Sequence, residues 1–202
     1  MEINAQQVKE LRDKIGVSMM ECKRALEQSG GNFDKAIDIL RQKGVAVAQK
    51  KATRATEQGL VESYIHPGGK VGVLLQLNCE TDFVARNDDF KSLAHDLCMQ
   101  IAAVSPQYVR REEVPAEIVE KERSIYKAQL EGQKKPPQVL DKIVEGKLDK
   151  FYKEVCLLEQ AFIKDDSLSI QDMITHKIAK LGENITLQRF VKFKVGEMDG
   201  KA

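Results

Sequence analysis

The pattern that most constrains the fold is a pair of strand-like segments separated by a tight turn. Residues 60–65 form the first segment, and the residues from His66 to Gly69 favour a turn because they include proline and glycine. In the second segment every other residue is apolar: Val71, Val73, Leu75 and Leu77. Such alternation is typical of a strand with one buried face, so the two segments predict an antiparallel hairpin against a core.

A third strand pattern lies near the end of the chain. One set of alternating residues is apolar except for an arginine: Ile185, Leu187, Arg189, Val191, Phe193 and Val195. Because alternate residues share a face, we expect Val191 and Phe193 to lie on the same face as Ile185. Helical patterns fill the sequence between the strands: 88–104, from Pro115 onward, 137–155 and 169–182. The predicted fold class is α+β, with a small antiparallel three-stranded sheet packed with helices.

Three short helical patterns occupy the N-terminal 45 residues. The first two begin with capping-box pairs, Asn4 with Gln7 and Ser18 with Glu21. The third is expected to end before Gly44, because glycine commonly follows the last residue of a helix. Three helices of this length predict a compact bundle like a ubiquitin-associated (UBA) domain.

Two adjacent methionines, Met19 and Met20, begin the second of these helices. Neighbouring helical residues do not face the same core, so at least one of the two side chains is expected at the surface. A flexible methionine at a loop–helix junction suits a docking contact. The alternative is that one methionine belongs to the core and the other is an incidental surface residue.

A run of basic residues connects this bundle to the strands: Arg41, Lys43, Lys50, Lys51 and Arg54. No acidic residue lies between Arg41 and Thr56, and the intervening alanines favour a helix. We favour a solvated connecting helix over 46–56, and a phosphate-contacting patch is the alternative.

The composition excludes several classes of protein. Apolar residues make up 42% of the 202 residues, which is enough for a folded core. The 32 basic and 31 acidic residues are balanced, which argues against direct nucleic-acid binding. No apolar run approaches the length of a membrane span, and the N-terminus lacks the order of a signal peptide. We therefore expect a cytoplasmic protein of bacterial type, with an organellar stroma or matrix as the alternative.

No motif for covalent chemistry or metal binding stands out. The cysteines are scattered, without C-x-x-C spacing: Cys22, Cys79, Cys98 and Cys156. We expect them to be buried free thiols. The sequence has no Gly-rich phosphate loop followed by Lys-Ser or Lys-Thr, and the pairs Asp88-Asp89 and Asp165-Asp166 suit helix entries and turns. We expect no enzyme, no catalytic residue, no metal and no cofactor; a site dispersed in the sequence is the alternative.

The run from Leu77 to Asn87 carries the strongest functional signal. It begins as the end of an apolar strand and turns polar, yet it keeps one aromatic residue, Phe83, among polar neighbours. One interpretation is that Phe83 folds back under a turn while Asp82 caps the next helix. The other is that Phe83 is inserted into a partner.

Three segments carry a resemblance to a known family. The first is the run from Thr81 to Arg86 that follows a strand. The second is Leu11-Arg12, Gly16 and the run from Met19 to Leu26, and the third is the run from Leu157 to Phe162 with Arg189–Phe193 and Gly196-Glu197. These segments resemble the elongation factor Ts family, occur in its order and cover nearly the whole chain.

The resemblance implies a guanine-nucleotide exchange factor for the GTPase elongation factor Tu. It places Asp82 and Phe83 beside the partner's magnesium site, and the N-terminal contacts on the GTPase domain. The implied partner-binding residues are Thr81, Asp82, Phe83, Val84, Arg86, Arg12, Met19 and Met20. The chain is similar to short family members, which lack a duplicated core and a protruding helical hairpin and pair two cores. The resemblance therefore implies a homodimer.

The expected domain organisation follows from these patterns. It comprises a UBA-like unit at 1–45, a basic linker at 46–56, an α+β core and dimerisation domain at 57–197, and a tail at 198–202. The N-terminal unit alone also permits a rival hypothesis. It could belong to an adaptor that binds ubiquitin-like or other protein surfaces without affecting a nucleotide.

Overall fold

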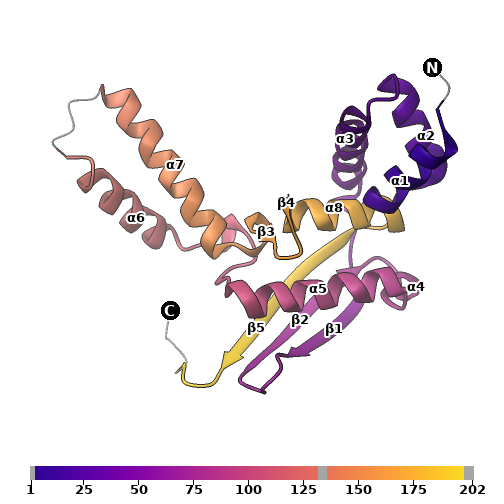
Figure 1. Cartoon of the computed structure of the whole chain (residues 1–202). Helices are drawn as coiled ribbons and strands as arrows, with labels where there is room; N and C mark the ends of the chain where they lie inside the picture. Colours follow the sequence, from indigo (N-terminus) through magenta and orange to yellow (C-terminus); the bar gives the residue numbers. More distant parts are fainter. Residues whose placement is uncertain (1–2, 132–135, 198–202) are drawn as a thin grey trace.

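Figure 1 presents the computed structural model of the chain, which describes residues 3–131 and 136–197. The tail expected at 198–202 lies outside the described residues. The α-helices are α1 (Ala5–Ile15), α2 (Met19–Gln28), α3 (Phe33–Lys51), α4 (Asp82–Ala85), α5 (Asp88–Val104), α6 (Ala116–Ala128), α7 (Pro137–Val155) and α8 (Ile170–Leu181). The strands are β1 (Gln58–Ile65), β2 (Val71–Cys79), β3 (Ala161–Phe162), β4 (Asp165–Ser169) and β5 (Ile185–Lys194), and short 3-10 helices lie at Arg111–Glu113 and Leu157–Glu159.

The main sheet has the antiparallel strand order β1–β2–β5. β1 and β2 form the predicted hairpin, and β5 joins β2 from far along the chain with Ile185 opposite Cys79. α5 lies across one face of the sheet, and α8 packs into the same core (Figure 1). The largest fully buried residues of this core include Phe90, Leu93, Leu97 and Ile101 of α5, Leu75 and Leu77 of β2, and Ile170 of α8. The α+β fold class is confirmed.

A bulge in β5 changes which residues of that strand face the core. Gln76 lies opposite Arg189 and Leu77 lies opposite Leu187, so the intervening Gln188 has no partner on β2. An extra residue in one strand reverses the faces of all residues beyond it. Phe190 therefore packs on the core, whereas Phe193 is 60% exposed.

The prediction that Val191, Phe193 and Val195 share the face of Ile185 was therefore wrong, because the alternation changes phase at the bulge. These residues are exposed, while Ile185 is buried. Across the strands, Leu74 is paired with Val191, and Gly72 with both Ile65 and Phe193, so their side chains share one face. We call this the open sheet face, and its apolar residues are Val61, Ile65, Leu74, Val191 and Phe193, all exposed.

The three N-terminal helices pack around a separate apolar cluster. Both predicted capping boxes are present, Asn4 with Gln7 and Ser18 with Glu21. α3 does not end before Gly44 as expected; it continues to Lys51. Gly44 is buried inside the helix, and a Cβ built on it lies 3.9 Å from the side chains of Ala179 and Thr175 on α8. The glycine therefore lies where α3 packs on α8 and does not mark a helix end.

Helices α6 and α7 form an antiparallel pair that extends away from the main sheet (Figure 1). Its outer half is held by a small buried cluster of Leu130, Val144 and Leu148. The expectation that this chain lacks a protruding helical hairpin was therefore wrong. α7 begins at Pro137, in the first turn as predicted, because proline has no amide hydrogen to lose there.

A second, two-stranded sheet of β3 and β4 was not predicted. The side chain of Asp165 accepts hydrogen bonds from the backbone nitrogen and the hydroxyl of Ser167, at 3.1 and 2.6 Å. These bonds lower the pKa of Asp165. Asp165 and Asp166 are the first residues of β4, so the expectation that this pair lies at a helix entry or in a turn was wrong. Among residues 3–131 and 136–197, no helix is both long and apolar enough to cross a membrane.

Candidate partner-binding site

The segment after β2 forms a single helical turn, α4, with Thr81 as its N-cap. The Thr81 hydroxyl accepts a hydrogen bond from the backbone nitrogen of Val84 at 3.4 Å. Val84 and Ala85 are partly buried and pack on the main core. Because these two residues face inward, the residue before them is turned to solvent.

Phe83 is the most exposed large apolar residue in the described part of the chain, at 82%. An exposed phenylalanine gains nothing from the core, so the interpretation that Phe83 folds back under a turn is excluded. The second part of that interpretation, that Asp82 caps the next helix, is also wrong. Asn87 caps α5, and its side chain accepts from the backbone nitrogen of Asp89 at 2.8 Å.

Asp82 instead pairs with Arg86 in the same turn, with 2.8 Å between Oδ2 and Nη2. The Arg86 side chain is 78% exposed, so water screens this ion pair strongly. A partner can therefore separate the two groups at small cost, and the Asp82 carboxylate is available for new contacts.

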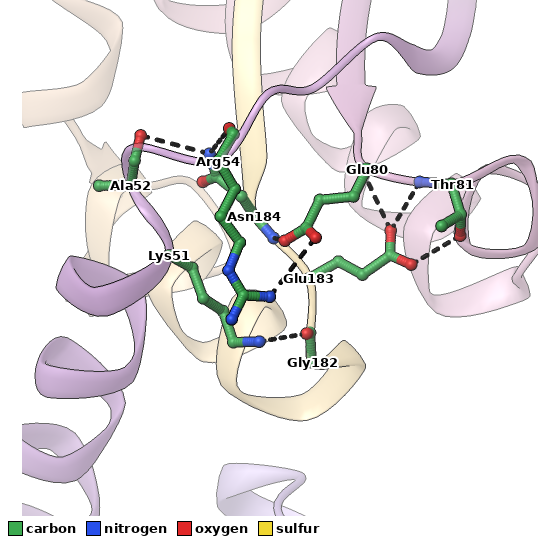
Figure 2. Close-up of polar contacts among 8 residues, drawn as sticks. All are labelled: Lys51, Ala52, Arg54, Glu80, Thr81, Gly182, Glu183 and Asn184. Carbon is green, nitrogen blue, oxygen red and sulfur yellow. Dashed lines mark hydrogen bonds and ion pairs between the residues drawn. The ribbon is translucent and has the colours of Figure 1, made fainter.

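A network of polar contacts holds the base of this segment (Figure 2). The carboxylate of Glu183, in the turn between α8 and β5, accepts from the backbone nitrogens of Glu80 and Thr81 at 3.1 and 3.0 Å. It also accepts from the Thr81 hydroxyl at 2.6 Å. Figure 2 shows the Glu183 side chain reaching across from this turn to the end of β2.

The same turn also receives the connection from the N-terminal helices. Lys51, the last residue of α3, donates to the carbonyl of Gly182. The side-chain amide of Asn184 donates to the carbonyl of Arg54 at 2.9 Å. The connecting helix expected over 46–56 is only partly present: residues 46–51 are the end of α3, and residues 52–54 form a turn and bend. Lys51 is held by a contact within the chain and is not simply solvated.

Glu80 joins the two halves of the network. Its carboxylate accepts from the backbone nitrogen of Asn184 at 2.6 Å and lies 3.5 Å from the Arg54 guanidinium. The hydrogen bond from Asn184, followed by the charge of Arg54, lowers the pKa of Glu80, so it is ionised at neutral pH. Sequence reasoning missed Glu80, Glu183 and Asn184, since their partners lie up to 132 residues away.

The other predicted contact residues lie on the N-terminal unit. Met19 and Met20 are both exposed, at 42% and 58%, beside the turn between α1 and α2. Arg12 is exposed in the last turns of α1. The structure therefore places the predicted residues in two groups on separate elements, one on α1 and α2 and one on α4.

The described residues offer no group for covalent or metal chemistry at these positions. Within 3–131 and 136–197, no cluster of three or more His, Cys, Asp or Glu residues could hold a metal ion. All four cysteines are buried and free. Burial raises the pKa of the Cys79 thiol to about 11 and that of Cys98 to about 12, which keeps both thiols protonated and unreactive.

Comparison with known proteins gives consistent results along the chain. A family model described as elongation factor TS matches residues 34–197. The chain is 62% identical over 197 residues to elongation factor Ts of Thermodesulfovibrio yellowstonii, covering 98% of each chain. It is 59% identical over 195 residues to that of Carboxydothermus hydrogenoformans, covering 96% of this chain and 90% of the relative. It is 58% identical over 197 residues to that of Fervidobacterium nodosum, covering 98% and 100%.

Proposed function

Because the chain belongs to the elongation factor Ts family, we propose that it is a guanine-nucleotide exchange factor that binds GDP-bound elongation factor Tu and promotes GDP release. Such a factor binds the empty GTPase more tightly than the GDP-bound form. By reciprocity, it weakens GDP binding by the same factor. A loss of about a thousandfold in GDP affinity corresponds to roughly 4 kcal/mol of coupling free energy.

The observation that carries this proposal is the exposure of Phe83 on a turn whose neighbours are held by the core. Burying one aromatic side chain in a partner contributes about 1.5–3 kcal/mol. Phe83 can therefore supply part of the coupling as an apolar wedge near the partner's magnesium site, and other contacts must supply the rest.

Asp82 contributes to the same step through charge. A bound magnesium ion neutralises much of the charge on the phosphates, so any disturbance of its ligands weakens the hold on GDP. Asp82 exchanges its screened pairing with Arg86 for contacts near that ion. Thr81, Val84 and Arg86 shape the turn that presents Asp82 and Phe83.

The N-terminal unit is proposed to hold the GTPase domain through Arg12, Met19 and Met20. Both methionines are exposed, and methionine adapts its shape to a partner surface. The mechanism requires neither covalent chemistry nor a cofactor in this chain.

We also propose that the chain forms a homodimer through the open sheet face. Five apolar residues lie on this face, drawn from all three strands, and a hollow lined by Val61, Leu74 and Val191 lies among them. An apolar face of this kind on a three-stranded sheet is stabilised when a second sheet covers it. Two copies of one face can pair through a twofold axis, which suits a homodimer.

The test of the exchange function is the release of fluorescent GDP from elongation factor Tu in magnesium buffer with excess GTP. We expect strong acceleration by the wild-type protein. Phe83→Ala should slow release about tenfold or more, since about 1.5–3 kcal/mol of burial is lost. It should leave the fold intact because the side chain is exposed.

Ile163→Ala provides the matched control, because Ile163 is an exposed apolar residue outside both contact groups. Normal exchange by a folded Phe83→Ala protein would refute the wedge and leave the function to other contacts. No acceleration by the folded wild-type protein would favour the adaptor hypothesis.

A further inference from the structure

At the end of β2, the carboxylate of Glu183 accepts the backbone hydrogen bonds that a neighbouring strand would otherwise accept. Regular pairing of β2 with β5 ends where Cys79 lies opposite Ile185. The next two backbone nitrogens of the β2 chain, those of Glu80 and Thr81, donate to Glu183 Oε2 at 3.1 and 3.0 Å. One side chain thus satisfies both backbone donors in the segment between the sheet and α4.

The third bond to this carboxylate fixes the direction of a hydroxyl. A carboxylate accepts hydrogen bonds and cannot donate, so the Thr81 hydroxyl must donate its single hydrogen to Glu183 Oε1, at 2.6 Å. The lone pairs of the Thr81 hydroxyl oxygen are then free to accept a hydrogen bond from Val84 N, which is the capping bond of α4. Bonds to an ionised acceptor are roughly twice as strong as neutral ones.

α4 depends on such external support. It has 4 residues, far fewer than an isolated helix needs to be stable. Its capping bond, from Val84 N to the Thr81 hydroxyl, is long at 3.4 Å and is therefore a weak cap by itself, so the bonds to Glu183 supply support that the cap does not.

We propose that Glu183 is a positioning residue for nucleotide exchange: acting through Thr81, it fixes α4 so that Phe83 points outward to the GTPase. The inference rests on the proposed exchange function. Glu183 itself need not touch the partner or the nucleotide.

The main variant is Glu183→Ala, which removes all three bonds. Exchange is measured as GDP release from elongation factor Tu at increasing concentrations of the full-length variant. This gives a maximal rate and a half-saturating concentration. We expect the maximal rate to fall about tenfold. This is the change expected when roughly one hydrogen bond to a charged group no longer holds α4 in place. The half-saturating concentration should change less, because the contacts on α1 and α2 are retained.

The Phe83→Ala background separates positioning from a general structural role. If Glu183 acts by presenting Phe83, then Glu183→Ala should reduce the exchange rate of the wild-type protein. Added to Phe83→Ala, it should not reduce the exchange rate further. The same loss in both backgrounds would overturn the proposal, as would wild-type rates for Glu183→Ala. A wild-type protein without exchange activity would reject the proposed function itself, which is a different result.

Two further variants guard against a folding defect. Glu183→Gln keeps an oxygen that can accept from both backbone nitrogens, so its rate should lie between those of the wild type and Glu183→Ala. Thr81→Val removes the hydroxyl alone; it should slow exchange and show no additional loss when combined with Glu183→Ala. Independent, additive losses in that pair would count against the proposal. Glu117→Gln, on the exposed surface of α6, is the charge-matched control and should exchange normally.

Discussion

Gly44 offers a sharp test of the structure, because the same substitution should have the opposite effect at two other glycines. We expect Gly44→Ala to stabilise the protein. The residue lies inside α3, and an added Cβ would lie 3.9 Å from Ala179 and Thr175 of α8, an ordinary contact distance. No neighbour has to move to accept the methyl group.

The magnitude follows from two favourable terms. Glycine within a helix is about 0.8–1.0 kcal/mol less favourable than alanine. Burial of the added carbon contributes up to about 0.8 kcal/mol. Allowing for imperfect packing, we expect the free energy of unfolding to rise by about 1 kcal/mol.

Gly182 and Gly59 are the comparison sites. Gly182 ends α8 with a φ of 78°, and no atom lies within 4 Å of an added Cβ. Alanine there should cost about 1–2 kcal/mol through backbone conformation alone. At Gly59, φ is 149° and an added Cβ would lie 2.7 Å from the Cα of Asn78, so strain and collision combine. This variant should be the least stable of the three.

The assay is urea-induced unfolding followed by circular dichroism, with the three variants compared with the wild type. The expected order of stability is Gly44→Ala, wild type, Gly182→Ala and Gly59→Ala. A loss of about 1 kcal/mol or more for Gly44→Ala would refute the reasoning, since that is the cost expected at a left-handed helix end. Such a loss would instead support the prediction from the sequence alone, that the third helix ends before Gly44.

Two further predictions concern assembly and pH. Val191→Lys places a charge on the open sheet face and should convert the dimer to a monomer, as measured by size-exclusion chromatography with light scattering. The control Ile163→Lys should remain a dimer. A monomeric wild-type protein would contradict the proposed dimer. His176 has a pKa below its ordinary value of about 6.5, owing to burial and then to Arg41, with Asp172 opposing. The unfolded chain therefore takes up a proton first, and the free energy of unfolding should fall as pH drops from about 7 to about 5. His176→Gln should flatten this dependence in chemical denaturation, and an unchanged slope would contradict it.

The sequence predicted the local features of the fold well. The capping boxes, the turn from His66 to Gly69 and the helix end at Gly182 each depend on residues within one or two turns of each other. Their physical causes are contained in a short window, so a single sequence is enough to identify them. The exposure expected of at least one of Met19 and Met20 follows from helical spacing in the same way.

The residues that hold the candidate site in place could not be predicted in this way. Phe83 could be singled out as an aromatic residue in a polar loop, but Glu183 lies over 100 residues from its partners. Nothing in the sequence around Glu183 distinguishes its carboxylate from one in solvent, because it follows a helix-ending glycine in an ordinary turn. The contact exists only because β5 is placed beside β2.

The helical hairpin was missed for a different reason. Its absence was expected from the resemblance to short family members. The helices themselves were predicted from their apolar spacing, which does not say whether two helices pack on a sheet or on each other. Two small clusters decide this: one contains Leu130, Val144 and Leu148, and the other contains Val114, Val155 and Cys156. Electrostatic contacts reinforce them, as in the pair between Arg123 on α6 and Glu145 on α7. A hairpin held by two small clusters depends on the exact positions of its apolar residues, which periodicity alone does not resolve.

The bulge at Gln188 connects the sequence error in β5 to the proposed assembly. A strictly alternating β5 would bury Val191 and Phe193 and turn Phe190 and Lys192 to solvent. With the extra residue, Phe190 packs on the core instead, and the Lys192 ammonium donates to the carbonyl of Ala102 at 2.9 Å at the end of α5. One inserted residue therefore exchanges the two faces over half a strand and creates an apolar outer surface. The bulge thus supplies core contacts within one chain and also the apolar surface through which we propose that two copies pair.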